Sequence, residues 1–184
     1  MILVVAGVAG SGKTTVGAML AGRLGWAFAD ADDFHPAANI VKMHAGIPLT
    51  DADRRPWLRA IGAWMDERIA RGESAVVGCS ALRRSYRDVL LDGRPEAQMV
   101  FLAVDREVLI RRLAARVGHF FPEQLLASQL QTLEPLGPDE RVIRVVPADT
   151  PAGTVDEIIA VLWPEGPPGR EPGAGAGGDH EAQA

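Results

Sequence analysis

Cysteine is almost absent from this sequence. Cys79 is the only cysteine among 184 residues, so no disulfide can form within the chain and nothing points to an oxidising compartment. The apolar stretch at residues 1–6 has no basic leader and runs directly into Gly7, so it is far shorter than a signal-peptide core or a membrane span. From these absences we expect a cytoplasmic protein.

A strong excess of charge of one sign is missing as well. The formal net charge is −5, but residues 164–184 hold one arginine against four acidic residues, so this tail carries −3 and residues 1–163 carry only −2. A nearly neutral body offers no electrostatic attraction to nucleic acid or to an acidic membrane surface. We therefore expect neither kind of partner.

The same tail lacks any residue that would anchor it. Its 21 residues include six glycines and four prolines but no aromatic or branched aliphatic side chain. This composition is typical of disordered segments. We interpret residues 164–184 as a disordered tail and residues 1–163 as one domain, a length that is sufficient for a single hydrophobic core.

Short apolar runs alternate with stretches of helical patterning within the domain. The runs lie at residues 2–6, 27–29, 75–79, 99–104 and 142–146. Continuously apolar strands that alternate with helices predict a five-stranded parallel sheet covered on both faces, which is an α/β three-layer fold. The last helix is expected to begin near Thr154, because Thr154 and Glu157 have the spacing of a capping box.

Two connections are longer than a crossover helix requires. Residues 35–72 contain a helix indicated by Trp57, Ile61, Trp64 and Met65, and we interpret this segment as a helical substrate cap whose tryptophans pack the helix. Residues 113–138 surround a short helical stretch with glycine and proline, and we interpret them as a mobile lid.

Residues 7–14 match the phosphate-binding pattern G-x-x-x-x-G-K-[ST]. The match follows an apolar strand and opens a helix patterned through Val16, Leu20 and Leu24, which is the context that a P-loop requires. In such a loop backbone N–H groups and the helix N-terminus bind phosphate, the lysine reaches the β- and γ-oxygens, and the threonine binds Mg²⁺. The pattern predicts an ATP site formed by Gly7, Val8, Ala9, Gly10, Ser11, Gly12, Lys13, Thr14 and Thr15.

Polar side chains follow the second and third predicted strands. The carboxyl ends of parallel strands meet at one edge of the sheet, so these side chains should face the P-loop. We assign Asp32 as the group that accepts or orients the proton of a substrate hydroxyl, and Asp30 as a ligand of Mg²⁺ through water. Asp33 is explained equally well as a cap of the following turn. Ser80 is a candidate for binding substrate after the third strand.

Arg112 and Arg116 lie four residues apart on the helix after Asp105, so both side chains share one face. We expect Arg116 to stabilise the transferring phosphoryl group and Arg112 to lie against adenine. Asp105 is interpreted as the helix N-cap, although residues 100–105 also imitate a Walker-B strand and leave a generic ATPase as an alternative. A GTP switch is disfavoured, because neither Asn-Lys-x-Asp nor Asp-x-x-Gly occurs.

Several strings of residues resemble the gluconokinase family of P-loop sugar-acid kinases. The resemblance spans nearly all of residues 4–163, and the strings that carry it are much more specific than the P-loop. They include His35-Pro36, Lys42-Met43, Asp53-Arg54, Pro56-Trp57-Leu58, Cys79-Ser80-Ala81-Leu82, Tyr86-Arg87-Asp88, Gly118-His119-Phe120, Ser128-Gln129 and Thr132-Leu133-Glu134. It implies ATP- and Mg²⁺-dependent phosphorylation of D-gluconate to 6-phospho-D-gluconate, an adenylate-kinase-like fold with a substrate cap and a lid, and a homodimer. Leu91 departs from the family, which tends to have arginine there.

A gluconate site needs a cation for the carboxylate, and the forked guanidinium of arginine suits that role. The candidates are Arg54, Arg83 and Arg87, with Arg54 in the cap as first choice; the alternative for Arg54 is a surface pair with the neighbouring aspartates. His35 and His119 are candidates for binding substrate hydroxyls, and a purely structural role is an alternative for both.

Two rival functions remain open at this level. A kinase for another small hydroxylated acid, such as shikimate, would use the same Asp-x-Asp and cap arrangement. A regulatory module that binds ATP without transferring phosphate would not need Asp32 or the paired arginines Arg112 and Arg116, so their presence argues against it.

Overall fold

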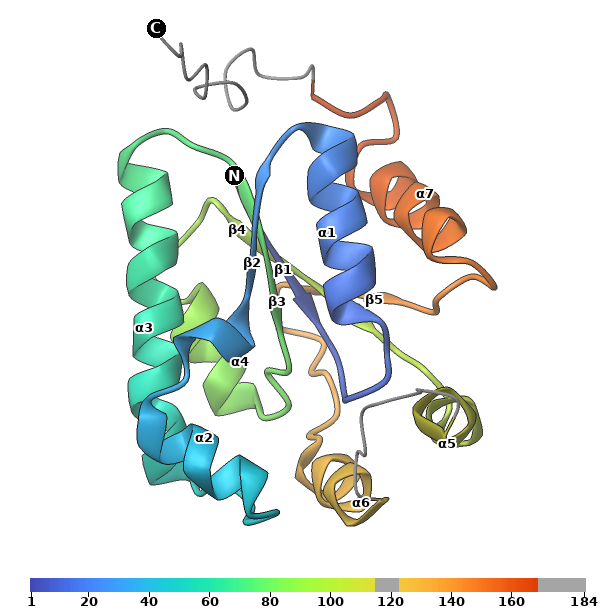
Figure 1. Cartoon of the computed structure of the whole chain (residues 1–184). Coiled ribbons are helices and arrows are strands. Elements are labelled where there is room, and N and C mark those ends of the chain that lie inside the picture. The colour runs from blue at the N-terminus through green and yellow to red at the C-terminus, as the bar shows by residue number, and fades with distance from the viewer. Residues whose placement is uncertain (115–122, 169–184) are drawn as a thin grey trace, which may run out of the picture.

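The computed structural model describes residues 1–114 and 123–168. Its sheet has the order β2-β3-β1-β4-β5, and every adjacent pair is parallel. The strands are β1 (Ile2–Ala6), β2 (Ala27–Asp30), β3 (Ala75–Cys79), β4 (Ala97–Leu102) and β5 (Val142–Val145). The expected five-stranded parallel sheet is therefore confirmed, with β1 at its centre (Figure 1).

Helices cover both faces of this sheet. On one face lie α1 (Lys13–Leu24) and α7 (Pro151–Leu162), and on the other lie α3 (Asp51–Ala70) and α4 (Arg84–Leu91) (Figure 1). Successive side chains of β1 alternate between the two cores, with Leu3 and Val5 in the core under α1 and α7, and Ile2 and Val4 in the core under α3 and α4. This burial of the strand on both faces explains why its sequence is continuously apolar.

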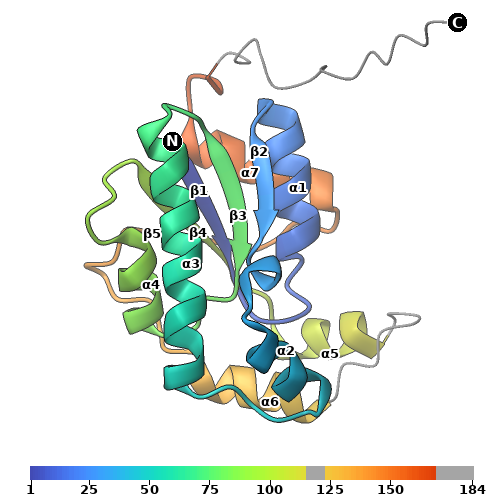
Figure 2. The ribbon, with the colours of Figure 1, turned by 60° about the vertical axis from the view of Figure 1, so that its left-hand side comes forward.

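The remaining helices lie beyond the carboxyl ends of the strands, at the lower edge of the sheet in Figures 1 and 2. They are the 3₁₀ helix η1 (Ala31–Phe34) and the α-helices α2 (Ala37–His44), α5 (Arg106–Ala114) and α6 (Glu123–Thr132). In a parallel sheet this edge is where ligands bind, so these elements and the P-loop surround the candidate site.

Hydrogen bonds within the predicted cap fix its two helices to each other. Thr50 caps α3 in a capping box with Asp53, as sequence and geometry both favour. The carboxylate of Asp53 also accepts two hydrogen bonds from Lys42 of α2, at 2.7 and 2.8 Å. These bonds, led by the one from Lys42, lower the pKa of Asp53 to about 2. Trp57 is buried, which confirms that it packs the cap helix.

Several boundaries differ from the sequence-based expectation, those of α7 and β4 by two residues or more. Helix α7 begins at Pro151 and is capped by Thr150, whose side-chain oxygen accepts the N–H of Gly153 at 3.0 Å, so the expected start near Thr154 is wrong. Thr154 is buried inside the helix. Strand β4 begins at Ala97, because parallel pairing with β1 includes Ala97 and Gln98, which are not strongly apolar. The strand ends at Leu102.

Part of the predicted lid, residues 115–122, and most of the predicted tail, residues 169–184, lie outside the described residues. Arg116 and His119 are therefore not placed. Across the helices that the structure does describe, none combines the length and the apolar character needed to cross a membrane.

Candidate active site

The P-loop turns from β1 into α1 through backbone conformations that require glycine. Gly12 has φ of 99° where α1 begins, a conformation that side chains rarely adopt. A Cβ on Gly7 would lie 2.7 Å from Oγ of Ser11 and 3.0 Å from the backbone oxygen of Leu102. The carbonyl oxygen of Val8 accepts hydrogen bonds from the N–H of Ser11 and from Nζ of Lys13, both at 3.1 Å. The loop thus has the tight curl that phosphate binding needs.

Two oxygen-bearing side chains meet beside this loop. The hydroxyl of Thr14 donates a hydrogen bond of 2.7 Å to Oδ2 of Asp30, at the end of β2. Hydroxyl and carboxylate oxygens are hard ligands of the kind that Mg²⁺ takes, and Mg²⁺ usually keeps several waters and binds few protein groups. The chemistry of the predicted pair therefore fits a magnesium ion.

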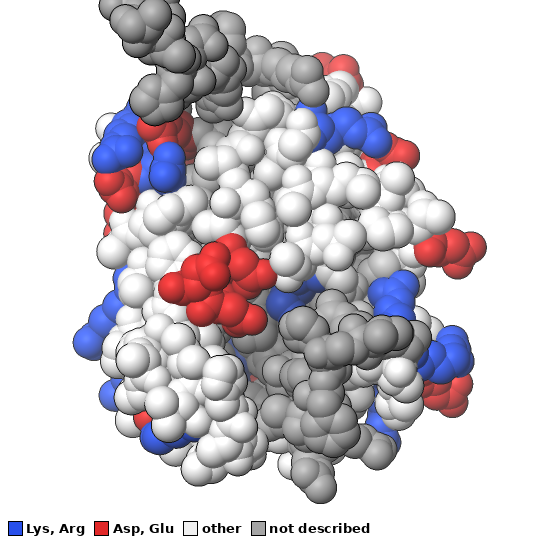
Figure 3. Space-filling view, viewed as in Figure 1, with Lys and Arg blue, Asp and Glu red and all other residues white. Residues whose placement is uncertain are grey.

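Asp32 stands in the 3₁₀ turn after β2, where Figure 3 shows an acidic cluster over η1. Asp30, and not Asp33, caps this turn, since its Oδ1 accepts the N–H of Asp32 at 3.1 Å. Partial desolvation, followed by the charge of Asp30, raises the pKa of Asp32, while His35 and Lys13 oppose the rise. Because 83% of the Asp32 side chain is solvent-exposed, its desolvation is weak, and the charge of Asp30 is the main cause of its raised pKa.

His35 is fixed beside Asp32 by a network within the cap. Its ring stacks on Trp57 with centroids 4.5 Å apart, and its side chain is only 5% exposed. The amide nitrogen of Asn39 donates to the carbonyl oxygen of Asp53 at 3.0 Å, so the same nitrogen, 3.3 Å from Nδ1 of His35, is a donor there as well. Nδ1 is then the acceptor, and Nε2 carries the proton 3.8 Å from Oδ1 of Asp32. Burial lowers the pKa of His35 and favours this neutral form.

Arg54 and Arg83 converge from different elements on Tyr86. Their guanidinium groups lie 5.8 and 5.9 Å from the centroid of the tyrosine ring. Arg83 donates to Oδ2 of Asp51 at 2.7 Å, the hydroxyl of Tyr86 donates to Oδ1 of the same carboxylate, and Arg54 donates to the Tyr86 oxygen at 3.4 Å. The hydrogen bond from Tyr86, with the charge of Arg83 as a smaller cause, lowers the pKa of Asp51. The expected alternative, a surface pair between Arg54 and its neighbouring aspartates, is not what the structure shows.

Among the predicted substrate residues that the structure describes, Arg87 is the one that lies buried away from the P-loop. Its side chain is fully buried and binds both carboxylate oxygens of Glu140, at 2.5 and 2.9 Å. Further donors reach the backbone oxygens of Leu82, Glu134 and Pro135. Arg87 therefore joins α4 to the segment after α6 and is not available to a substrate. The same bonds anchor the C-terminal part of the predicted lid.

The turn after β3 brings Ser80 to the carboxyl edge of the sheet. Ala81, which follows it, has φ of 40° and is fully buried, an uncommon conformation for a residue with a Cβ. The backbone oxygen of Ser80 accepts the N–H of Gly7 at 3.4 Å, so the turn abuts the P-loop. Burial raises the pKa of the Cys79 thiol to about 12, which leaves this residue as a small apolar side chain.

Helices α5 and α6 both contact the P-loop backbone. A guanidinium nitrogen of Arg112 lies 3.5 Å from the backbone oxygen of Ser11, and Oε1 of Gln129 accepts the N–H of Ala9 at 2.7 Å. Sequence reasoning missed Gln129 and Tyr86 as site residues. Both lie in strings that resemble the family named in the sequence analysis, but neither lies in a local motif that would predict its role.

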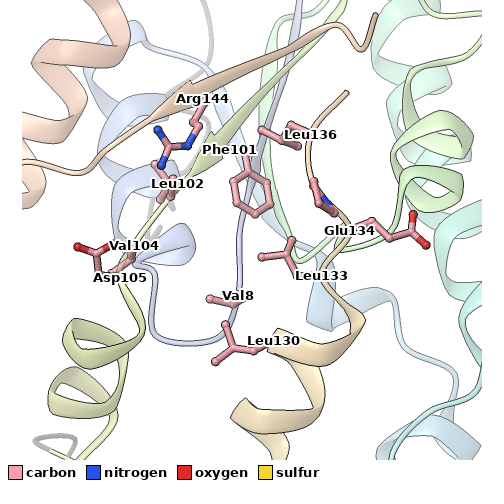
Figure 4. A pocket seen from close by; sticks show the side chains of 12 residues that line it. Val8, Phe101, Leu102, Val104, Asp105, Leu130, Leu133, Glu134, Leu136 and Arg144 are labelled. Atoms are coloured by element: carbon pink, nitrogen blue, oxygen red, sulfur yellow. The ribbon is translucent and has the colours of Figure 1, made fainter. Parts of the chain in front are cut away.

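A separate cavity of about 420 Å³ lies near the ends of β4 and β5, and Figure 4 shows Phe101, Leu133 and Arg144 around it. Val8 is the one predicted site residue that lines it. Asp105, Glu134 and Arg144 line this cavity, but the side chains of Asp32, His35 and Arg54 do not, so we take the polar side chains at the carboxyl edge of the sheet beside the P-loop as the candidate active site.

Comparison with known proteins gives concordant results. A family model described as an AAA domain matches residues 2–136. A gluconokinase of Gluconobacter oxydans is 49% identical over 157 residues, which cover 85% of this chain and 88% of the relative. The crystal structure of a gluconokinase from Sinorhizobium meliloti superimposes with a TM-score of 0.78 at 48% identity, over 87% of this chain and 90% of that one.

A more distant structure shares the fold alone. Shikimate kinase from Aquifex aeolicus superimposes with a TM-score of 0.56 at 17% identity, over 88% of this chain and 96% of that one. Its likeness supports the P-loop kinase architecture and carries no information on substrate. With nearly half of the aligned residues identical, over most of the length of both proteins, the chain belongs to the gluconokinase family.

Proposed function

We propose that this protein is a gluconokinase, which transfers the γ-phosphoryl group of ATP to the 6-hydroxyl of D-gluconate. One observation carries the proposal: a chain of contacts connects the P-loop to a pair of arginines. Thr14 of the P-loop binds Asp30, Asp30 binds the N–H of Asp32, and Nε2 of His35 lies 3.8 Å from Asp32. His35 in turn stacks on Trp57 of α3, the helix that carries Arg54. A substrate with a hydroxyl at one end and a carboxylate at the other fits this order of groups.

The residues divide the reaction between them. The substrate hydroxyl oxygen forms a bond to the γ-phosphorus while the bond to the bridging oxygen breaks and ADP leaves. Asp32 receives or orients the hydroxyl proton, and Lys13 neutralises charge on the phosphates. Thr14 and Asp30 would hold Mg²⁺, the latter through water, and the ion would offset further phosphate charge. Arg116, outside the described residues, is proposed to stabilise the transferring group.

At the end of the site that is farther from the P-loop lysine, we assign the carboxylate of gluconate to Arg54 and Arg83. Paired guanidinium groups recognise a carboxylate through forked hydrogen bonds, and the two converge on Tyr86. His35 presents its Nε2 proton next to Asp32 and is proposed to bind a substrate hydroxyl. Ser80 and His119 keep the same proposed role, and Arg112 keeps its proposed place against adenine.

A coupled assay of ADP release across a panel of sugar acids tests this function. We expect release that depends on Mg²⁺ and gluconate, and no release with shikimate or glucose. Activity with shikimate instead of gluconate would favour the rival kinase. ATP binding without turnover on any acid would favour a regulatory module. A cytoplasmic location and a homodimer complete the proposal, and gel filtration of the purified protein tests the latter.

A further inference from the structure

A hydrogen bond joins α6 to the P-loop across 120 residues of sequence. Oε1 of Gln129 accepts the backbone N–H of Ala9 at 2.7 Å, in a partly buried position. A backbone N–H can only donate, so the amide oxygen of the glutamine must face it. Neither phosphate binding nor substrate recognition, as assigned above, uses this side chain.

The N–H of Ala9 and the C=O of Val8 belong to one planar peptide group and point in opposite directions. On its carbonyl side this group accepts Nζ of Lys13 and the N–H of Ser11, both at 3.1 Å. On its N–H side it is bound by Gln129. Rotation of the peptide plane would therefore break the hydrogen bond to Gln129 and move the oxygen that holds the lysine ammonium group.

Apolar packing holds α6 in place for this contact. Val8 is buried in a cluster with Leu126, and Leu130 and Leu133 pack against the same cluster. Figure 4 shows Val8 next to Leu130 of α6. The residue that flanks the peptide is thus clamped by its side chain, while the peptide itself is fixed by Gln129.

We propose that Gln129 is a positioning residue of the ATP site, which fixes the Val8–Ala9 peptide plane and through it the position of the Lys13 ammonium group. The inference rests on the proposed function only in that the P-loop binds ATP. It does not depend on which acid accepts the phosphate. Because Gln129 reaches Lys13 through the backbone, its loss should disturb the nucleotide end of the site and leave the acid end unchanged.

Steady-state kinetics of Gln129→Leu test the role, with Gln131→Leu as the control. Leucine keeps most of the volume but removes the acceptor, and Gln131 is an exposed glutamine of the same helix. We expect kcat/KM for ATP to fall about 5- to 150-fold, the range for a buried N–H that loses its acceptor, while the KM for gluconate stays within about twofold. Wild-type ATP kinetics in Gln129→Leu, or an equal loss for both substrates, would overturn the proposal.

A double-mutant cycle separates action through Lys13 from a general structural effect. Binding of a fluorescent ADP analogue is measured for Gln129→Leu in the wild-type background and in Lys13→Met. The substitution should weaken binding in the first and change it little in the second, because the lysine that it positions is gone. Equal weakening in both backgrounds would contradict the proposed route. This readout needs no acid substrate, so it stands even if gluconate is not the acceptor.

Amide hydrogen exchange of the wild-type protein covers the case in which Gln129→Leu does not fold. NMR can follow individual amides in a chain of 19.6 kDa. The bond to Gln129 predicts slow exchange of the Ala9 N–H without nucleotide, at least about tenfold slower than in an unstructured loop. Exchange at the rate of an unstructured peptide would show that the bond does not hold the loop.

Discussion

The proposed phosphate end and acid end of the site are built in different ways. The proposed phosphate end is one unbroken segment, residues 7–15, in which backbone N–H groups would bind phosphate. The acid end draws on Arg54 of α3 and Arg83 at the start of α4, and these side chains are held together through Tyr86 and Asp51. A backbone site depends on glycine where the loop turns, as at Gly7 and Gly12, whereas a side-chain site depends on the contacts among its members.

Removal of the P-loop lysine should give the largest loss of activity and should affect only the phosphate end of the site. In Lys13→Ala we expect turnover to fall by about 3 to 5 orders of magnitude, since the lysine neutralises charge that develops in the transition state. The melting temperature should stay close to that of the wild type, because Lys13 is not a member of the apolar clusters that form the core. Turnover is measured by ADP release, and near wild-type turnover would rule out the proposed mechanism.

The group between the two ends should affect turnover without affecting nucleotide binding. Asp32→Asn keeps the size of the side chain but removes its charge, so kcat should fall about 100- to 10,000-fold with little change in the KM for ATP. The wild-type pKa is raised, so kcat should decline as pH falls through a value above 3.8, the ordinary pKa of aspartate. The variant should lack this acid limb in a pH profile, and an identical limb in both proteins would assign it to another group.

The buried pair of Arg87 and Glu140 should affect stability and not recognition. Arg87→Met leaves a buried carboxylate unpaired, which should lower the free energy of unfolding by about 3 to 5 kcal/mol at pH 7. The double substitution with Glu140→Met removes both charges and should recover most of the loss. Both effects are measured by denaturant unfolding.

The pH dependence of that loss sharpens the test. Arg87 lowers the pKa of Glu140, so the wild-type pair stabilises the fold above 4.5, the ordinary pKa of glutamate, and loses this stabilisation as pH falls through the lower folded value. The difference between Arg87→Met and wild type should therefore shrink in acid. A substrate role for Arg87 would instead raise the KM for gluconate in a variant of normal stability.

Arg54→Ala should weaken the acid end more gently. We expect the KM for gluconate to rise, with kcat less affected and a loss of about 30- to 1,000-fold in kcat/KM, because a carboxylate far from the reacting hydroxyl is bound similarly in ground and transition states. Arg55→Ala is the matched control, since Arg55 is its exposed neighbour. An effect of Arg83→Ala without one of Arg54→Ala would place the carboxylate nearer α4.

Truncation of the tail should have the smallest effect, because none of its residues is assigned to the phosphate end or the acid end of the site. Removal of residues 165–184 takes away no branched aliphatic or aromatic side chain, so the melting temperature and both KM values should remain near those of the full chain. Thermal melts and steady-state kinetics measure this, and a clear drop in melting temperature would move the domain boundary.

The same contrast explains what the sequence could predict. The P-loop and the strands of the sheet can be predicted because their signals are local. The P-loop has a motif of eight residues, and each strand has a short apolar run. Arg87 was misassigned because its burial depends on the segment near Glu140, more than fifty positions away. Thr150 was overlooked as the cap of α7 although Pro151, a favoured first residue of a helix, marked it. Gln129 has no local signal, because its partner is set only by the packing of α6.

The place of β1 in the sheet has a consequence for the order in which the protein assembles. Ile2 pairs with Ala75 on one side and with Ala97 on the other, so the strand that leads into the P-loop can gain its first neighbour only when β3 has been made and its second only when β4 has been made. Pairings between such distant residues form slowly, because a long loop must close first. During synthesis the P-loop residues are therefore made long before the strands that hold β1 in the sheet. Nucleotide can stabilise the chain only after the central strands have come together.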